Sequence, residues 1–306
     1  MPVISFLKLI RLPNLLMIIG TQFLVKYFLF EAFGLDITLS DFGFILLVSS
    51  MVFLAAAGNI INDIFDVKTD AINKPEKQII GSKISETAAY NWFFAFNILG
   101  VGIGFYLSNL IGKPSFTALF IIPSAMLYLY ATQLKRTILV GNLVVSIMVA
   151  MIIVMVGIFD LYPAITPQNQ TTQKVIFSIL IDYSIFAFLV NFLREMVKDQ
   201  EDIKGDYNAE MQTLPVVIGR SRTNKIIFFL GLLPLAGVVY YIYQYLYFNN
   251  LAVIYVLFFI VGPLLYFLVK IPTAKTKKHF RHLSLVLKLT LLFGILSIGL
   301  YPFILL

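Results

Sequence analysis

Long apolar stretches, separated by short polar segments, account for most of this 306-residue chain. A helix needs about 20 consecutive apolar residues to cross the hydrocarbon core of a bilayer. Nine stretches meet that requirement, at residues 13–31, 43–64, 88–110, 115–133, 138–160, 175–195, 224–246, 251–270 and 284–305. Helix-breaking residues separate neighbours, as Gly112 and Pro114 do between the third stretch and the fourth. The pattern predicts nine transmembrane helices.

Composition favours a membrane protein with little room for a soluble domain. Hydrophobic residues make up 59% of the chain and charged residues 13%, where a soluble domain carries about a quarter. We therefore expect an all-α polytopic membrane bundle of nine helices, forming a single domain over residues 1–306. The chain has no cysteine and two histidines, which excludes thiolate catalysis and disulfides and makes a histidine-rich metal site unexpected.

Positive charge is distributed unevenly between the polar segments. Most of the 23 Lys and Arg residues fall in segments that nine spans place on the side of the N-terminus, whereas Lys113 and Lys174 fall on the other. Because positive segments stay cytoplasmic, we expect the cytoplasmic membrane, with the N-terminus inside. The net charge of +7 then reflects topology, and no nucleic acid partner is expected. Lys26, near the outer end of the first span, is expected to extend its ammonium group to the membrane surface.

Two clusters of aspartates stand where long apolar segments end. The first is Asn62-Asp63-x-x-Asp66-x-x-x-Asp70, and the second is Asp199-x-x-Asp202-x-x-x-Asp206. On a helix, spacings of three and four place the carboxylates of each cluster on one face. Three like charges on one face repel each other, so a multivalent cation is the simplest partner. Ionisable side chains inside a membrane are costly and are usually functional.

The two clusters suit magnesium ions and a diphosphate. Magnesium takes oxygen ligands and usually binds through one or two carboxylates together with substrate phosphates. We expect two or more Mg²⁺ ions, bound with the diphosphate of an intramembrane enzyme that acts on a diphosphate ester. Basic side chains near the clusters are expected to share the charge of the diphosphate; these candidates are Lys74, Lys77, Lys135, Arg194 and Lys198. A cation-coupled transporter and a structural lipid-scaffolding protein are the alternatives from other classes.

The clusters and their surroundings resemble the UbiA-type intramembrane prenyltransferases. The family pattern N-D-x-x-D-x-x-x-D is met by Asn62 to Asp70, and the segment that follows, to Ser85, is similar to the family sequence. Lys74 and Lys77 replace two family arginines, which keeps the charge but loses bidentate phosphate geometry. Three further elements match: Asp202 to Asp206, then Thr213-Leu214 and Gly219; Tyr130 to Lys135-Arg136; and Arg11-Leu12-Pro13-Asn14.

The resemblance covers the full length and implies a role for each matching residue. It implies catalytic carboxylates at Asp63, Asp66, Asp70, Asp199, Asp202 and Asp206. All of these except Asp199 are expected to bind Mg²⁺. It implies substrate-binding residues at Asn14, Asn62, Lys74, Lys77, Tyr130, Lys135, Arg194 and Lys198. The fold implied is a nine-helix bundle with a cytoplasm-facing cap, built from segments 66–87 and 196–223, over a central cavity.

One run points to a branch of the family. Residues 194–206 look most like the digeranylgeranylglyceryl phosphate synthases, which attach a geranylgeranyl chain to the free hydroxyl of geranylgeranylglyceryl phosphate. The resemblance thus implies a polyprenyl diphosphate donor and a lipid acceptor. The alternative within the family is an aromatic prenyltransferase of quinone biosynthesis. Membrane lipid is the expected surrounding partner, and no obligate protein partner is evident.

Overall fold

The computed structural model describes residues 3–73 and 78–305, and every regular element within these ranges is helical. Nine segments of this described part are long and apolar enough to cross a membrane, which confirms the predicted all-α membrane fold. The first five are α2 (Leu12–Phe23) with η1 (Leu24–Phe30), α3 (Asp41–Phe65), α5 (Glu86–Leu110), η3 (Pro114–Thr117) with α6 (Ala118–Thr132), and α7 (Val140–Val156) with η5 (Gly157–Leu161) and η6 (Tyr162–Ala164).

The remaining four spans come from the second half of the chain. They are α8 (Gln170–Asn208), α10 (Arg220–Tyr241) with η7 (Ile242–Leu246), α11 (Asn250–Val256) continued by η8 (Leu257–Val261), α12 (Gly262–Lys270) and η9 (Ile271–Thr273), and α13 (Lys277–Leu296) with η10 (Ser297–Leu300) and α14 (Tyr301–Leu305). Shorter helices outside the spans are α1 (Val3–Leu9), α4 (Val67–Asn73), η4 (Leu134–Arg136) and α9 (Leu214–Ile218).

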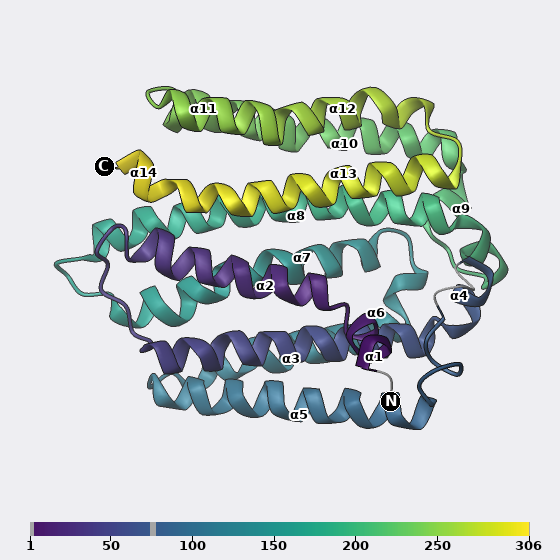
Figure 1. Ribbon diagram of the computed structural model, residues 1–306, viewed down its shortest axis with the longest axis horizontal. Coiled ribbons are helices and arrows are strands. Elements are labelled where there is room, and N and C mark those ends of the chain that lie inside the picture. Colours follow the sequence, from purple (N-terminus) through teal and green to yellow (C-terminus); the bar gives the residue numbers. More distant parts are fainter. Residues whose placement is uncertain (1–2, 74–77, 306) are drawn as a thin grey trace.

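The spans run side by side along the long axis of the molecule (Figure 1). α3 packs against α5, α8 packs against both α7 and α13, and α13 also contacts α2. The two ends of the chain lie at opposite ends of the bundle, as an odd number of spans requires (Figure 1). The short helices α1, α4 and α9 gather at the end where the N-terminus lies, called here the α1 end; the other is the α14 end.

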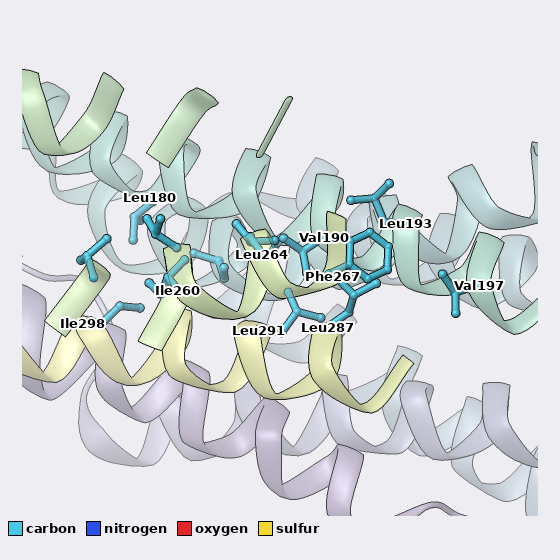
Figure 2. Packing of buried hydrophobic residues seen from close by; sticks show 14 of the residues in the cluster. Leu180, Val190, Leu193, Val197, Ile260, Leu264, Phe267, Leu287, Leu291 and Ile298 are labelled. Atoms are coloured by element: carbon cyan, nitrogen blue, oxygen red, sulfur yellow. The ribbon is translucent and has the colours of Figure 1, made fainter. Parts of the chain in front are cut away.

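The largest buried cluster fixes α8 in the bundle. Val190 and Leu193 of α8 meet Phe267 of α12 and Leu287 of α13, and all four side chains are buried (Figure 2). Lipid tails are as apolar as these side chains, so van der Waals packing rather than escape from water holds membrane helices together. This packing sets the position of α8, and thereby of the second aspartate cluster, relative to α13.

The polar segments that carry the clusters are more helical than the sequence indicated. α8 continues to Asn208 instead of ending near residue 195, and its 39 residues span about 58 Å at 1.5 Å per residue. The second cluster therefore lies on a helix that extends past the apolar span, not in a loop. The first cluster is divided, because α3 ends at Phe65, Asp66 is its C-cap residue, and Asp70 belongs to α4.

The expectation for Lys26 was wrong. Its side chain is 1% exposed, and its ammonium group donates to the Leu39 carbonyl at 2.8 Å and lies 3.8 Å from Asp160 Oδ2. The other oxygen of Asp160 accepts the Leu39 N–H at 2.8 Å. A charge so far from water needs a partner, and here Asp160 of η5 supplies it. The pair ties η1, the segment before α3 and η5 together at the α14 end.

A cavity of about 260 Å³ lies toward the α14 end, between α8, α10, α11 and α13. Its walls include Tyr183 and Asp182 of α8 and Tyr241 of α10. Because this space is remote from the aspartate clusters, the central cavity expected beneath them stays a prediction, as does the cap.

Candidate functional site

The first cluster forms where α3 ends at the α1 end of the bundle. Asp63, in the last turn of α3, accepts a hydrogen bond of 2.8 Å from Arg11 Nη2. Asp66 accepts one of 2.6 Å from Asn62 Nδ2 and a second from the ammonium group of Lys135. Lys135 is 8% exposed and belongs to η4, which follows the fourth span. Tertiary packing therefore brings together three separate sequence elements: the first cluster, Lys135, and the Arg-x-Pro-Asn element.

Arg11 stands at the turn between α1 and α2. Its backbone adopts the left-handed conformation, with φ 55° and ψ 53°, directly before Leu12 and Pro13 begin α2. A residue other than glycine in this region carries strain that the surrounding structure must hold. Burial opposes the guanidinium charge, but Asp63 and Asp66 more than offset that effect, so the pKa of Arg11 is raised above its ordinary value.

The second cluster lies on the extended part of α8. Asp199 accepts a hydrogen bond of 2.8 Å from Asn142 Nδ2 of α7. Asp206 is buried and accepts one of 3.1 Å from the Thr213 hydroxyl, just before α9. The carboxylates of this cluster are thus oriented from two neighbouring elements. Thr213 is part of the family-like Thr-Leu element, and its hydrogen bond to Asp206 explains why a hydroxyl side chain is suited to this position.

A buried glutamate organises the basic residues of α8. Glu195 is bound by Arg194 Nη1 at 3.1 Å and by Lys198 Nζ at 2.7 Å. Both cations were expected to act on the diphosphate, and the structure shows that one carboxylate holds them side by side. Glu195 was not among the predicted site residues. Its signal was available, because an acid inside an apolar span is rarely without function.

The elements that carry the two clusters lie against each other. α4, which carries Asp70, packs against α8. The phenol of Tyr130 on α6 lies within electrostatic range of Asp66, Glu195 and Asp199. Arg11 likewise acts on both Asp63 and Glu195. The fold thus brings the elements that carry the two clusters together, with Tyr130 and Arg11 within electrostatic range of acidic side chains from both the first cluster and α8.

The donor set is suited to a hard cation that binds together with a ligand. Carboxylate and amide oxygens line the site, and the buried Oδ1 of Asn62 has no hydrogen-bond partner. Within the described ranges no three acidic or histidine side chains converge into a ready-made metal cluster. Arg11 and Lys135 instead stand against the carboxylates of Asp63 and Asp66. This arrangement fits Mg²⁺, which recruits one or two carboxylates and completes its shell with water and phosphate oxygens.

Other predicted residues have different outcomes. Lys74 and Lys77 lie outside the described residues. Asn14, on α2, accepts a hydrogen bond of 2.9 Å from Lys288 Nζ of α13. Lys288 was not among the predicted site residues, although a single lysine within the last apolar span was a visible signal. Asn142 was not predicted either, since no motif in the sequence around it marks it as a site residue.

Nine membrane spans, counted over the described residues, and two aspartate clusters on elements that pack together are the arrangement expected of an intramembrane enzyme of the prenyltransferase class. Comparison with known proteins identifies the family. Residues 27–293 match the UbiA prenyltransferase family, so the chain belongs to that family and is a prenyltransferase.

Relatives of this chain share one function by name. A digeranylgeranylglyceryl phosphate synthase from Methanobrevibacter smithii is 32% identical over 70% of this chain and 69% of its own length. The protein of the same name from Korarchaeum cryptofilum is 32% identical over 81% of each chain.

Solved structures share the fold. A digeranylgeranylglyceryl phosphate synthase in membranes has a TM-score of 0.63 at 22% identity, covering 97% of this chain and 98% of that chain. A UbiA homolog from Archaeoglobus fulgidus bound to DMAPP and Mg²⁺ has a TM-score of 0.56 at 17% identity, covering 96% and 99%.

Proposed function

We propose that this enzyme transfers a geranylgeranyl group from its diphosphate to the free hydroxyl of geranylgeranylglyceryl phosphate and releases diphosphate. The packing of α4, which carries Asp70, against α8, which carries the second cluster, supports the proposal, together with the contact of Lys135 with Asp66. The synthases from Methanobrevibacter smithii and Korarchaeum cryptofilum, together with the family-like run 194–206, support this acceptor.

Magnesium ions bound with the diphosphate would neutralise the charge that the leaving group acquires. Five carboxylates would hold them, from Asp63, Asp66, Asp70, Asp202 and Asp206. Asn62, with its unpartnered Oδ1, would add an oxygen ligand or orient Asp66. We assign Asp199 a supporting role, because Asn142 already fixes its carboxylate. Two or more ions match the two clusters.

The basic residues would bind the diphosphate as the metal-facing carboxylates rearrange. Lys135 and Arg11 each neutralise one aspartate in this structure. When cations and diphosphate enter between the clusters, both side chains are in position to exchange a carboxylate for a phosphate oxygen. Charge-assisted hydrogen bonds of this type are among the strongest in proteins. Lys198, Lys74 and Lys77 would complete the positive surroundings.

The reaction then balances as follows. The bond between C1 of the allylic chain and the diphosphate oxygen breaks, and diphosphate leaves with the electron pair. The glycerol hydroxyl oxygen of the acceptor forms a new bond to C1 and loses its proton, which the released diphosphate or an aspartate accepts. The allylic cation that develops at C1 must be kept from water, which the surrounding apolar spans achieve. Tyr130 would place its aromatic face near this charge.

The proposed location is the cytoplasmic membrane, with the site facing the cytoplasm. Its support is the charge distribution, since the segments at the α1 end carry most of the Lys and Arg residues. α4 and α9 lie at that end (Figure 1), as do the end of α3 and the last turns of α8, which carry the aspartate clusters. α4 and the segment around α9 would form the cap that closes over bound substrates.

An acceptor panel tests the function. Purified protein in nanodiscs receives magnesium and geranylgeranyl diphosphate, and is offered geranylgeranylglyceryl phosphate, 4-hydroxybenzoate or 1,4-dihydroxy-2-naphthoate, with products identified by mass. We expect the diether lipid. A prenylated aromatic product in its place would overturn the acceptor and leave the prenyltransferase chemistry standing.

A further inference from the structure

Lys288 lies on α13, inside an apolar membrane span. It lies about 16 Å along the helix from Lys277, at 1.5 Å per residue. Its ammonium group donates a hydrogen bond of 2.9 Å to the neutral Asn14 Oδ1 of α2, and no carboxylate forms an ion pair with it in the described part of the chain. A cation held in a membrane span by an amide alone is costly, so a missing anion is the simplest explanation.

Arg194 of α8 lies within electrostatic range of Lys288. α13 packs along α8, and the two positive charges are close enough to repel each other. Arg194 donates a hydrogen bond from Nη1 to Glu195, while its Nε is buried and has no hydrogen-bond partner. Glu195 is shared with Lys198. These four side chains, Lys288, Arg194, Lys198 and Glu195, thus hold three positive charges against one negative charge.

The position of this positive charge separates it from the diphosphate site. Arg194 precedes Asp202 by eight residues on α8, which is about 12 Å toward the middle of the membrane. Lys288 lies at a comparable depth, because it and Arg194 are each seven residues from the ion pair between Arg281 of α13 and Glu201 of α8. The aspartate clusters lie nearer the α1 end. A second anion, distinct from the diphosphate, would therefore be bound closer to the middle of the membrane than the donor's diphosphate, near the reactive carbon of the donor.

We propose that Lys288, Asn14 and Arg194 form a subsite for the phosphate monoester of the lipid acceptor. A phosphate monoester carries about −1.5 to −2 charges at pH 7, which would offset the positive charges of Lys288 and Arg194. Lys288 Nζ and the free Arg194 Nε supply donors, and Asn14 orients Lys288. The phosphate held here would place the glycerol hydroxyl toward the donor. This inference rests on the proposed function, because it names how that acceptor is selected.

The test uses full-length protein in nanodiscs with saturating magnesium and geranylgeranyl diphosphate. Two acceptors are compared: geranylgeranylglyceryl phosphate and geranylgeranylglycerol, which lacks the phosphate. In Lys288→Gln we expect kcat/KM for the phosphorylated acceptor to fall roughly 10- to 150-fold, mainly through KM, because one charge-assisted hydrogen bond is lost. Turnover of geranylgeranylglycerol and the KM for the donor are expected to stay within about twofold, since neither involves the acceptor phosphate.

Controls separate charge from structure. Lys278→Gln removes an exposed positive charge from the same helix and is expected to leave kcat/KM unchanged for both acceptors. Lys288→Arg keeps the charge and is expected to retain most of the preference for the phosphate; it also serves as the test variant if Lys288→Gln does not insert. Equal losses on both acceptors, or a raised KM for the donor, would overturn the subsite. If wild-type protein makes no diether and prenylates an aromatic acid, the proposed function fails first, without any variant.

Discussion

The ion pair between Asp66 and Lys135 offers the sharpest test of the site. Asp66→Asn keeps the shape of the side chain and removes its charge, which leaves Lys135, 8% exposed, without a carboxylate. If Asp66 binds magnesium with the diphosphate, its loss removes preorganised charge stabilisation, and kcat should fall by roughly 10²–10³, or about 2.7–4 kcal/mol. Lys135→Gln should cost a similar factor, because its ammonium group would contact the same diphosphate.

The double variant decides whether the two side chains act together. Residues in direct contact are coupled, and a charge-assisted hydrogen bond contributes about 1.5–3 kcal/mol. We therefore expect the combined loss to be smaller than the sum of the single losses by that amount.

The assay is single-turnover formation of prenylated product in nanodiscs, with insertion checked by size-exclusion chromatography. Asp36→Asn, an exposed change of the same chemistry at the α14 end, is the matched control and should be fully active. Near-normal turnover in Asp66→Asn would refute the metal assignment, and strictly additive losses would show that the pair does not act as a unit.

Three further expectations concern stability and metal. Lys26→Met should destabilise the solubilised protein by about 3–5 kcal/mol, since it leaves Asp160 buried without its cation. Adding Asp160→Asn should recover part of the loss in Tm. An unchanged Tm in Lys26→Met would contradict the role of the pair. Gly104→Ala should lower Tm by an amount equivalent to about 1–3 kcal/mol, because its new Cβ would meet the Phe120 ring at 2.3 Å. The control is Gly102→Ala on the same helix, whose Cβ meets nothing within 4 Å and which should be neutral or stabilising. Equal effects of the two variants would argue against this packing. Chelation with EDTA should abolish turnover and added Mg²⁺ should restore it, and turnover that persists in EDTA would remove magnesium from the reaction.

Much of the fold could be read from the order of residues along the chain. Nine apolar stretches predict nine spans because a bilayer has a fixed thickness and leaves backbone groups no partner but each other. The spacing of three and four in the aspartate clusters is local, so it too is visible in sequence. The extent of α8 was missed, since its last turns are polar and are stabilised by neighbours such as Asn142, Thr213 and α4 rather than by an apolar pattern.

The partners of charged side chains depended on distant segments, which no local pattern encodes. Lys26 lies near the end of a span, where the sequence favours contact with water, yet its side chain is buried and pairs with Asp160 from the fifth span. Arg11 meets Asp63, Lys135 meets Asp66, and Lys288 meets Asn14 only because helix packing closes separations of 52, 69 and 274 residues. Sequence thus sets which segments enter the membrane, through the cost of unpaired polar groups in lipid. Packing of side chains between those segments sets which charges meet, and those meetings form the site.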